Sequence, residues 1–242
     1  MNRKAKDRGI VAKRRSNSIP VVKNKSLKRF IEWSGGVSVL IGIVCCVFLD
    51  IHRMPSRSME NTILYSEYIL SEGVTYGVRL PFFGIRLPGI REPRQGDVVV
   101  FRSTEHSAHD YLKRCIASAG QTVEIRRKAV YVDGNRMADP SLSKYIDPEV
   151  LPAEFDTRDN LAPKIVPSNH LFVIGDNRDN SRDSRHWGAL PTDRVTGRAV
   201  FVFWSRNRAQ GDILSSDIGL FLSSVWSLPS FVRWNRLGKI LS

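Results

Sequence analysis

The segment Gly175–Gly188 reads GDNRDNSRDSRHWG and follows the apolar run Leu171–Ile174 directly. After its first glycine, every residue up to Arg185 is charged, Asn or Ser. One interpretation of such a polar stretch is a solvated surface loop. The alternative is a closed hydrogen-bond network, because alternating acids, amides and arginines can pair with one another and hold a site rigid.

Short runs rich in Val, Ile, Phe and Tyr flank this segment and are separated by Gly, Pro, Asn and Asp. This pattern is typical of β-strands. No segment between residues 55 and 205 has a helical period, so the sequence predicts a mainly β domain. The polar, Pro-punctuated stretch 134–169 is predicted to be an accessory insertion. The expected strands are 68–71, 97–102, 109–117, 122–126, 129–132, 170–174 and 195–204, with a turn at Asp133-Gly134.

Positive charge is concentrated at the N-terminus. Residues 1–29 contain eleven Lys and Arg and one acid, so they carry ten of the thirteen net positive charges. The 17 residues from Trp33 to Leu49 then contain no charge, which is near the lower limit for crossing a bilayer. A buried core helix is the alternative. Because a basic segment precedes the run, we predict a cytoplasmic tail over 1–29 and a transmembrane anchor over 30–50. A cleaved signal peptide is disfavoured, because no small-x-small site follows.

These boundaries place a β-rich catalytic domain over 51–212, outside the cytoplasm, and a C-terminal apolar and basic segment over 213–242. Within that segment, 218–232 is too short to span a membrane comfortably, and basic and aromatic residues follow it. An interfacial segment is one interpretation, and an amphipathic helix packed on the domain is the other. The apolar loop Leu80–Leu87 is expected to dip into the lipid surface.

A metal centre is not expected. The five histidines are scattered, and none is spaced from a cysteine as zinc ligands are. Cys45 and Cys46 lie in the apolar run, and Cys115 stands alone in the rest of the chain. We therefore expect neither a metal nor a cofactor.

Two further segments contain residues that can carry chemistry. The first, Met54–Met59 (MPSRSM), has two serines at positions i and i+2 in a turn. The second, Tyr111–Ile116 (YLKRCI), places Lys113 inside an apolar strand pattern. If this lysine is desolvated, its pKa falls and its neutral amine can accept a proton from a hydroxyl. The alternative is a lysine that protects an edge strand from aggregation.

PSRSM, GDVVVF, YLKR and GDNRDNSRDSRHWG occur in the order and spacing of the type I signal peptidases of bacteria, and the sequence over 54–204 resembles that family. The resemblance implies an antiparallel-sheet catalytic domain with an N-terminal anchor. It also implies that Ser58 is the nucleophile, that Lys113 is the general base, and that Ser56 forms the oxyanion hole with the backbone N–H of Ser58. Such a Ser–Lys dyad is a variant of the serine-protease triad.

The resemblance assigns supporting roles as well. It implies that Ser181 orients the lysine amine and that Asp183 and Arg185 form an ion pair behind the site. Met59 is expected to form a wall of the substrate pocket. Two departures from the family pattern, Arg57 in place of Gly and Glu60-Asn61 in place of x-Pro, bear on substrate preference more than on the dyad.

The resemblance implies a membrane-bound serine endopeptidase that cleaves signal peptides from exported preproteins after small residues, of the Ala-x-Ala type. It would be a single-pass protein of the bacterial cytoplasmic membrane. Its expected partners are preprotein signal peptides and membrane phospholipid, but no nucleic acid. Three alternatives stay open: a specialised peptidase of a pilus or conjugation system, a membrane-tethered nucleic-acid binder that uses the basic tail, and an inactive homologue.

Overall fold

The computed structural model describes residues 25–78, 85–103, 110–205 and 232–241. The chain divides into two units at Gly42/Ile43. The elements are α1 (Lys25–Phe48), β1 (Leu49–Arg53), β2 (Tyr68–Glu72), β3 (Val98–Arg102), β4 (Asp110–Ser118), β5 (Thr122–Arg126), β6 (Ala129–Val132), β7 (Asn135–Arg136), β8 (Leu161–Ile165), β9 (His170–Ile174), α2 (Ser184–Trp187), β10 (Leu190–Pro191), η1 (Thr192–Arg194), β11 (Val195–Trp204) and η2 (Trp234–Arg236).

The described part of the first unit is helical and presents apolar side chains to its surroundings. Phe30, Trp33 and Leu40 are all more than half exposed on α1. Among the described residues, no helix combines the length and the apolar character needed to cross a membrane. The helix ends at Phe48, so Leu49 and Asp50, the last two residues of the predicted anchor range 30–50, belong to the strand β1.

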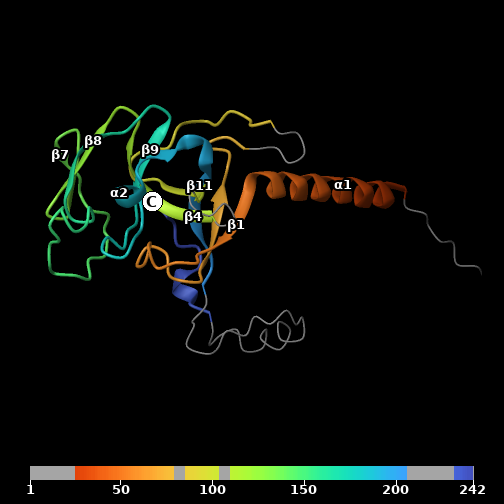
Figure 1. Cartoon of the computed structure of the whole chain (residues 1–242). Coiled ribbons are helices and arrows are strands. Elements are labelled where there is room, and N and C mark those ends of the chain that lie inside the picture. The colour runs from red at the N-terminus through yellow and green to blue at the C-terminus, as the bar shows by residue number, and fades with distance from the viewer. Residues whose placement is uncertain (1–24, 79–84, 104–109, 206–231, 242) are drawn as a thin grey trace, which may run out of the picture. The chain divides into compact units, whose positions relative to one another are not determined.

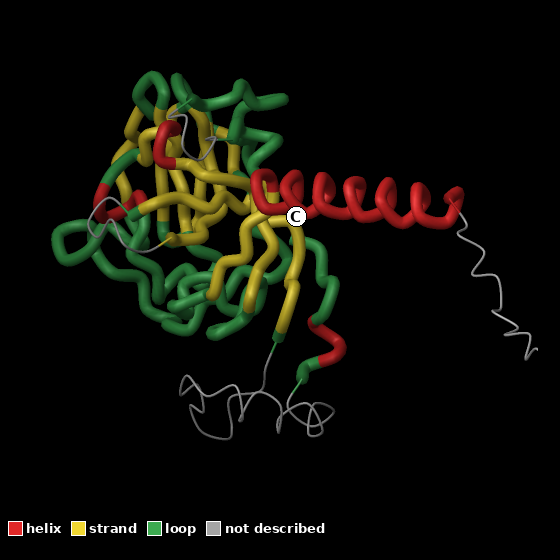
Figure 2. The backbone as a smooth tube through the Cα atoms, turned by 90° about the vertical axis from the view of Figure 1, so that its right-hand side faces the viewer, coloured by secondary structure: helices red, strands yellow, loops and turns green. Residues whose placement is uncertain are grey.

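The second unit contains two antiparallel sheets, so the prediction of a mainly β, antiparallel domain is confirmed (Figures 1 and 2). The larger sheet has the strand order β1-β2-β11-β3-β4-β9-β10, and the smaller one has the order β7-β6-β5-β8. In the larger sheet, β4 lies between β3 and β9. Its central residues, 112–117, are all buried, which is the longest buried run within a described strand of the sheet.

The smaller sheet incorporates the predicted insertion 134–169, at the left in Figure 1. The Asp133-Gly134 turn joins β6 to β7, and both of its residues have positive φ, as a tight hairpin turn requires. β8 was not expected, because it contains Pro163. A proline cannot donate to the ladder, but β8 is at the edge of the sheet and tolerates it there.

A short helix also departs from the expectation of no helix between 55 and 205. α2 is a single turn, too short to give a helical period in the sequence. It is capped by Asp183, whose side chain accepts from the N–H of Arg185.

Several expectations fall wholly or partly on residues outside the described ones. These are most of the basic tail, most of the Leu80–Leu87 loop, His109, and the C-terminal segment up to residue 231.

Candidate active site

Ser58 lies in the loop between β1 and β2, and its position is fixed from two sides. The N–H of Asn177 donates to the Ser58 carbonyl at 2.9 Å, which ties the loop to the segment after β9. One residue further on, the Met59 carbonyl accepts from the N–H of Ile63 at 2.8 Å and closes a helical turn. Ser58 itself is 6% exposed. The serine therefore sits on a constrained turn at the edge of the core.

Lys113 projects from the buried centre of β4 to Ser58. Its Nζ lies 2.5 Å from Ser58 Oγ, and the residue is 2% exposed. Burial lowers the pKa of Lys113 to about 8, with a smaller lowering by the charge of Arg185, while the charges of Asp183 and Asp176 oppose the shift. Desolvation disfavours the ammonium form. At pH 7 about a tenth of the amine is therefore neutral and can accept the serine proton, far more than for an ordinary lysine with a pKa of about 10.4.

Asp183 and Arg185 form an ion pair whose charges act on this amine. Arg185 makes two hydrogen bonds to the carboxylate of Asp183, both at 2.8 Å, and both side chains are buried. Burial raises the pKa of Asp183, but the charge of Arg185 and the hydrogen bonds from Arg185 and from the Gly175 N–H outweigh it, so the net pKa lies below its ordinary value. Asp183 is thus a fixed carboxylate whose charge is largely matched by Arg185.

Ser56 lies next to Ser58. Its hydroxyl is 3.0 Å from Ser58 Oγ, and the residue is only partly buried. A hydroxyl at this place can turn toward an oxyanion that develops on a bound carbonyl. Its part in an oxyanion hole stays a prediction.

Ser181 is near the site but makes no hydrogen bond to Lys113. Its hydroxyl is buried and has no hydrogen-bond partner in the described part of the chain, so the predicted contact with the amine is not formed here. The space beside it is very tight. A Cβ on Gly175 would stand 2.2 Å from Ser181 Oγ and 2.5 Å from the Ser58 carbonyl oxygen. Gly175 thus lets the segment after β9 approach the serine.

The predicted role of Met59 as a wall of the pocket needs correction. Met59 is 0% exposed and belongs to a core cluster with Met54 and Ile63. Its sulfur accepts a weak hydrogen bond from the N–H of Asp176. The apolar side chain is more stable in the core than in a solvated cleft. It therefore packs on the core side of the serine turn and supports that turn.

A second buried ion pair, between Arg114 and Asp176, was not predicted from the sequence. Arg114 makes two hydrogen bonds to Asp176, at 2.9 and 2.8 Å, and Thr62 Oγ1 donates to the same carboxylate at 2.6 Å. This carboxylate therefore joins β4, the serine loop and the segment after β9. The available signal was Arg114 itself, a second cation within an otherwise apolar strand, which requires a buried acid.

The two departures on the serine turn have distinct structural consequences. Arg57 is exposed and does not adopt a positive φ, so the turn forms without a glycine. Glu60 forms an ion pair with Lys144 at 3.0 Å and is 3.4 Å from the Asn177 amide. Glu60 therefore fastens the serine turn to the insertion. No group of three or more potential metal ligands occurs among the described residues.

The buried Ser–Lys contact and the four motifs agree with a match to a family model. Residues 27–204 match the family "signal peptidase, peptidase S26". The chain belongs to this family. Among its relatives, signal peptidase I of Pseudomonas aeruginosa is 32% identical over 181 residues, which cover 63% of this chain and 64% of that relative. Signal peptidase I of Rickettsia typhi is 26% identical, with 90% and 94% covered.

The family has relatives of different lengths. The match with the Pseudomonas aeruginosa enzyme spans just under two thirds of that protein. A crystal structure of a signal peptidase I from Enterococcus faecalis is 26% identical, with a TM-score of 0.37, and covers 46% of this chain and 98% of that one.

The first prediction concerns pH. Only the neutral amine can accept the serine proton, and burial lowers the pKa of Lys113 to about 8. We therefore expect kcat/KM for cleavage of a preprotein to rise tenfold per pH unit below about pH 8 and to level off above it. The measurement is a pH–rate profile between pH 5 and 10. An acid limb with a midpoint near 10 would contradict a desolvated base.

The second prediction concerns Gly175. A methyl group there would collide with the Ser181 hydroxyl and the Ser58 carbonyl. Because a displacement of the nucleophile by about 1 Å costs on the order of 100-fold in rate, we expect Gly175→Ala to lower kcat by about that factor. Gly36→Ala is the control, since nothing lies within 4 Å of the added methyl. Equal rates for the two variants would refute this role of Gly175.

Proposed function

We propose that this protein is a serine endopeptidase that removes N-terminal signal peptides from exported preproteins after small residues of the Ala-x-Ala type. The observation that carries the proposal is the 2.5 Å contact between the buried Lys113 amine and the Ser58 hydroxyl. A free hydroxyl is a weak nucleophile and needs a base in contact with it. Family membership supports the substrate class, since the relatives are named signal peptidase I.

The geometry supports the following sequence of steps. Lys113 takes the Ser58 proton while Oγ bonds to the carbonyl carbon of the scissile peptide. The Ser58 N–H and the Ser56 hydroxyl stabilise the resulting oxyanion, and one such donor is worth about 3–4 kcal/mol. The Lys113 ammonium then gives its proton to the departing amine, which breaks the C–N bond and leaves an ester on Ser58. Finally, the neutral amine takes a proton from water, and the resulting hydroxide attacks the ester carbon. The bond from that carbon to Ser58 Oγ then breaks, the Lys113 ammonium returns its proton to Oγ, and the carboxyl product leaves.

We further propose that α1 anchors the protein in the bacterial cytoplasmic membrane, with residues 1–29 cytoplasmic and the domain from β1 onward outside. The uncharged run Trp33–Leu49 after a basic segment supports this orientation. The exposed apolar side chains of α1 support it too, because isolated apolar surface of this extent needs a nonpolar partner. A signal peptide in the same membrane would be cut just outside the lipid. Membrane phospholipid would then be a second partner.

The third prediction tests the dyad. A purified preprotein with an Ala-x-Ala site is incubated in detergent with the wild type, Ser58→Ala and Lys113→Ala, and cleavage is followed by mass. Loss of the nucleophile or of the base should lower kcat by about a million-fold, as it does in a serine-protease triad. Circular dichroism should show that both variants are folded.

Cys115→Ala is the matched control on β4. Its thiol is 0% exposed, and burial raises its pKa to about 12, so it stays protonated and takes no part in the chemistry. We expect this variant to retain the wild-type rate within about threefold, since the site has only to absorb a small cavity. Full cleavage by Lys113→Ala, or loss of cleavage only in Cys115→Ala, would refute the proposed function.

A further inference from the structure

The C-terminal stretch Val232–Leu241 packs against the catalytic domain, although the match to the family ends at residue 204. The Leu241 N–H donates to the Val200 carbonyl at 2.8 Å, and the Val202 N–H donates to the Lys239 carbonyl at 3.0 Å. Leu241 is 2% exposed and belongs to the core cluster that contains Met59. The end of the chain thus adds to β11 and to the core beneath the serine turn.

An ion pair joins this stretch to the serine loop. Arg236 makes two hydrogen bonds to the carboxylate of Glu67, both at 2.8 Å, and Glu67 is 0% exposed. The same carboxylate accepts from the Leu64 N–H and the Ser205 hydroxyl. Burial raises the pKa of Glu67, but the hydrogen bonds from Arg236 and these donors outweigh it, so the net pKa lies below its ordinary value. The pair therefore persists throughout the working pH range.

Arg236 also holds the middle of the loop. Its Nη2 donates to the Thr62 carbonyl at 2.9 Å, and its Nη1 contacts the Asn61 carbonyl at 3.4 Å. Asn61 has a φ of +79°, in the left-handed region, which asparagine adopts more readily than most residues. One guanidinium thus spans the loop from Asn61 to Glu67.

The part of the loop that Arg236 holds is directly coupled to the dyad. The hydroxyl of Thr62 donates to Asp176, which is paired with Arg114, the residue after Lys113. On the other side, only three residues separate Thr62 from Ser58. A shift of the loop would therefore reach both members of the dyad, one along the chain and one through the Asp176 carboxylate.

We propose that Arg236 is a positioning residue for the nucleophile, which locks the loop 59–67 and thereby keeps Ser58 within reach of Lys113. This inference rests on the proposed peptidase function. It assigns the C-terminal stretch a role in catalysis as well as in stability. Two bonds to one carboxylate and two contacts to backbone carbonyls require the planar fork of an arginine, so a lysine can replace it only in part.

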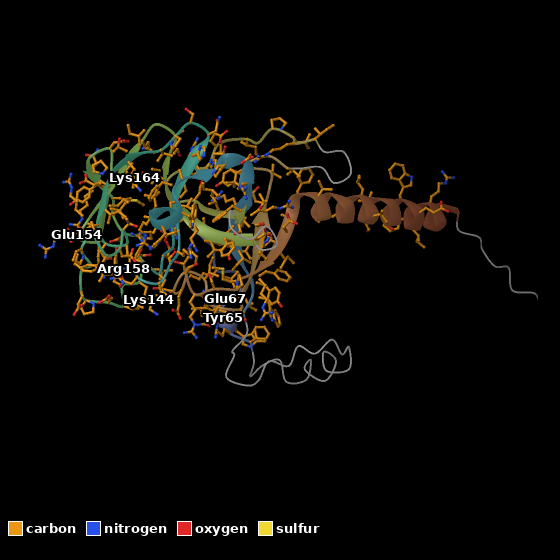
Figure 3. All side chains as sticks on the ribbon, in the orientation of Figure 1. Tyr65, Glu67, Lys144, Glu154, Arg158 and Lys164 are labelled. Carbon is orange, nitrogen blue, oxygen red and sulfur yellow. The ribbon has the colours of Figure 1, made fainter. Side chains whose placement is uncertain are left out.

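The test compares Arg236→Gln with Arg158→Gln. Arg158 is a matched control, because its side chain is also 12% exposed and makes two hydrogen bonds to a buried carboxylate, that of Asp159. It lies in the smaller-sheet region, apart from Glu67 (Figure 3). Cleavage of the Ala-x-Ala preprotein in detergent is measured for both full-length variants, together with their melting temperatures.

Both variants should melt at a lower temperature than the wild type. Only Arg236→Gln should lose kcat, by about tenfold or more with KM within twofold, because a misplaced nucleophile affects the chemical step and not substrate binding. The acid limb of the pH–rate profile of Arg236→Gln should also move to higher pH, because Lys113 becomes better solvated. The acid limb of Arg158→Gln should not move. Arg236→Lys should be intermediate in kcat, and it supplies the same comparison where Arg236→Gln fails to fold.

Equal kcat values for the Arg236 and Arg158 variants, with unmoved acid limbs, would overturn the positioning role. An inactive wild type, or activity that survives Ser58→Ala, would instead remove the proposed function. The two failures are therefore distinguishable in one set of assays.

Discussion

The contact between the Lys113 amine and the Ser58 hydroxyl is the constraint on which the site depends. A lysine becomes a base near neutral pH only if the protein withholds water from it, and the centre of β4 supplies that dryness. Nearby carboxylates would reverse the effect by favouring the ammonium. The pairing of Asp183 with Arg185 and of Asp176 with Arg114 limits this, because each negative charge already has a buried positive partner. The two ion pairs therefore allow Asp183 and Asp176 to lie near the amine without raising the pKa of Lys113 back to its ordinary value.

The same carboxylates assemble the site from distant parts of the chain. Asp176 contacts Thr62 in the serine loop and Arg114 in β4, and its neighbour Gly175 leaves no room for a side chain. Breaking such a buried pair on one side leaves an uncompensated charge, which is strongly destabilising. Precise placement of the dyad and stability of the domain are therefore properties of one network. The Arg236–Glu67 pair extends that network to the end of the chain.

Much of this architecture was predictable from the sequence, because strands with β-branched runs and turn residues are local features. The bounds of β5, β6, β9 and β11 agree with those predicted. β1 was missed because Leu49 continues the apolar run of α1, and only pairing with β2 identifies it as a strand. The dyad was expected from the family resemblance. Three features were not expected, because each depends on long-range packing that motif spacing does not encode. They are the burial of Met59, the absence of a Ser181–Lys113 hydrogen bond, and the Arg236–Glu67 pair.

The most direct test of this account is a titration of the Lys113 amine itself. Isotope-labelled lysine in the full-length protein, with Lys113→Arg to assign its signal, would report its protonation by NMR independently of turnover. The account predicts a midpoint near pH 8, because burial outweighs the neighbouring carboxylates. A midpoint at the ordinary lysine value of about 10.4 would show that the amine is a charged side chain and not the base.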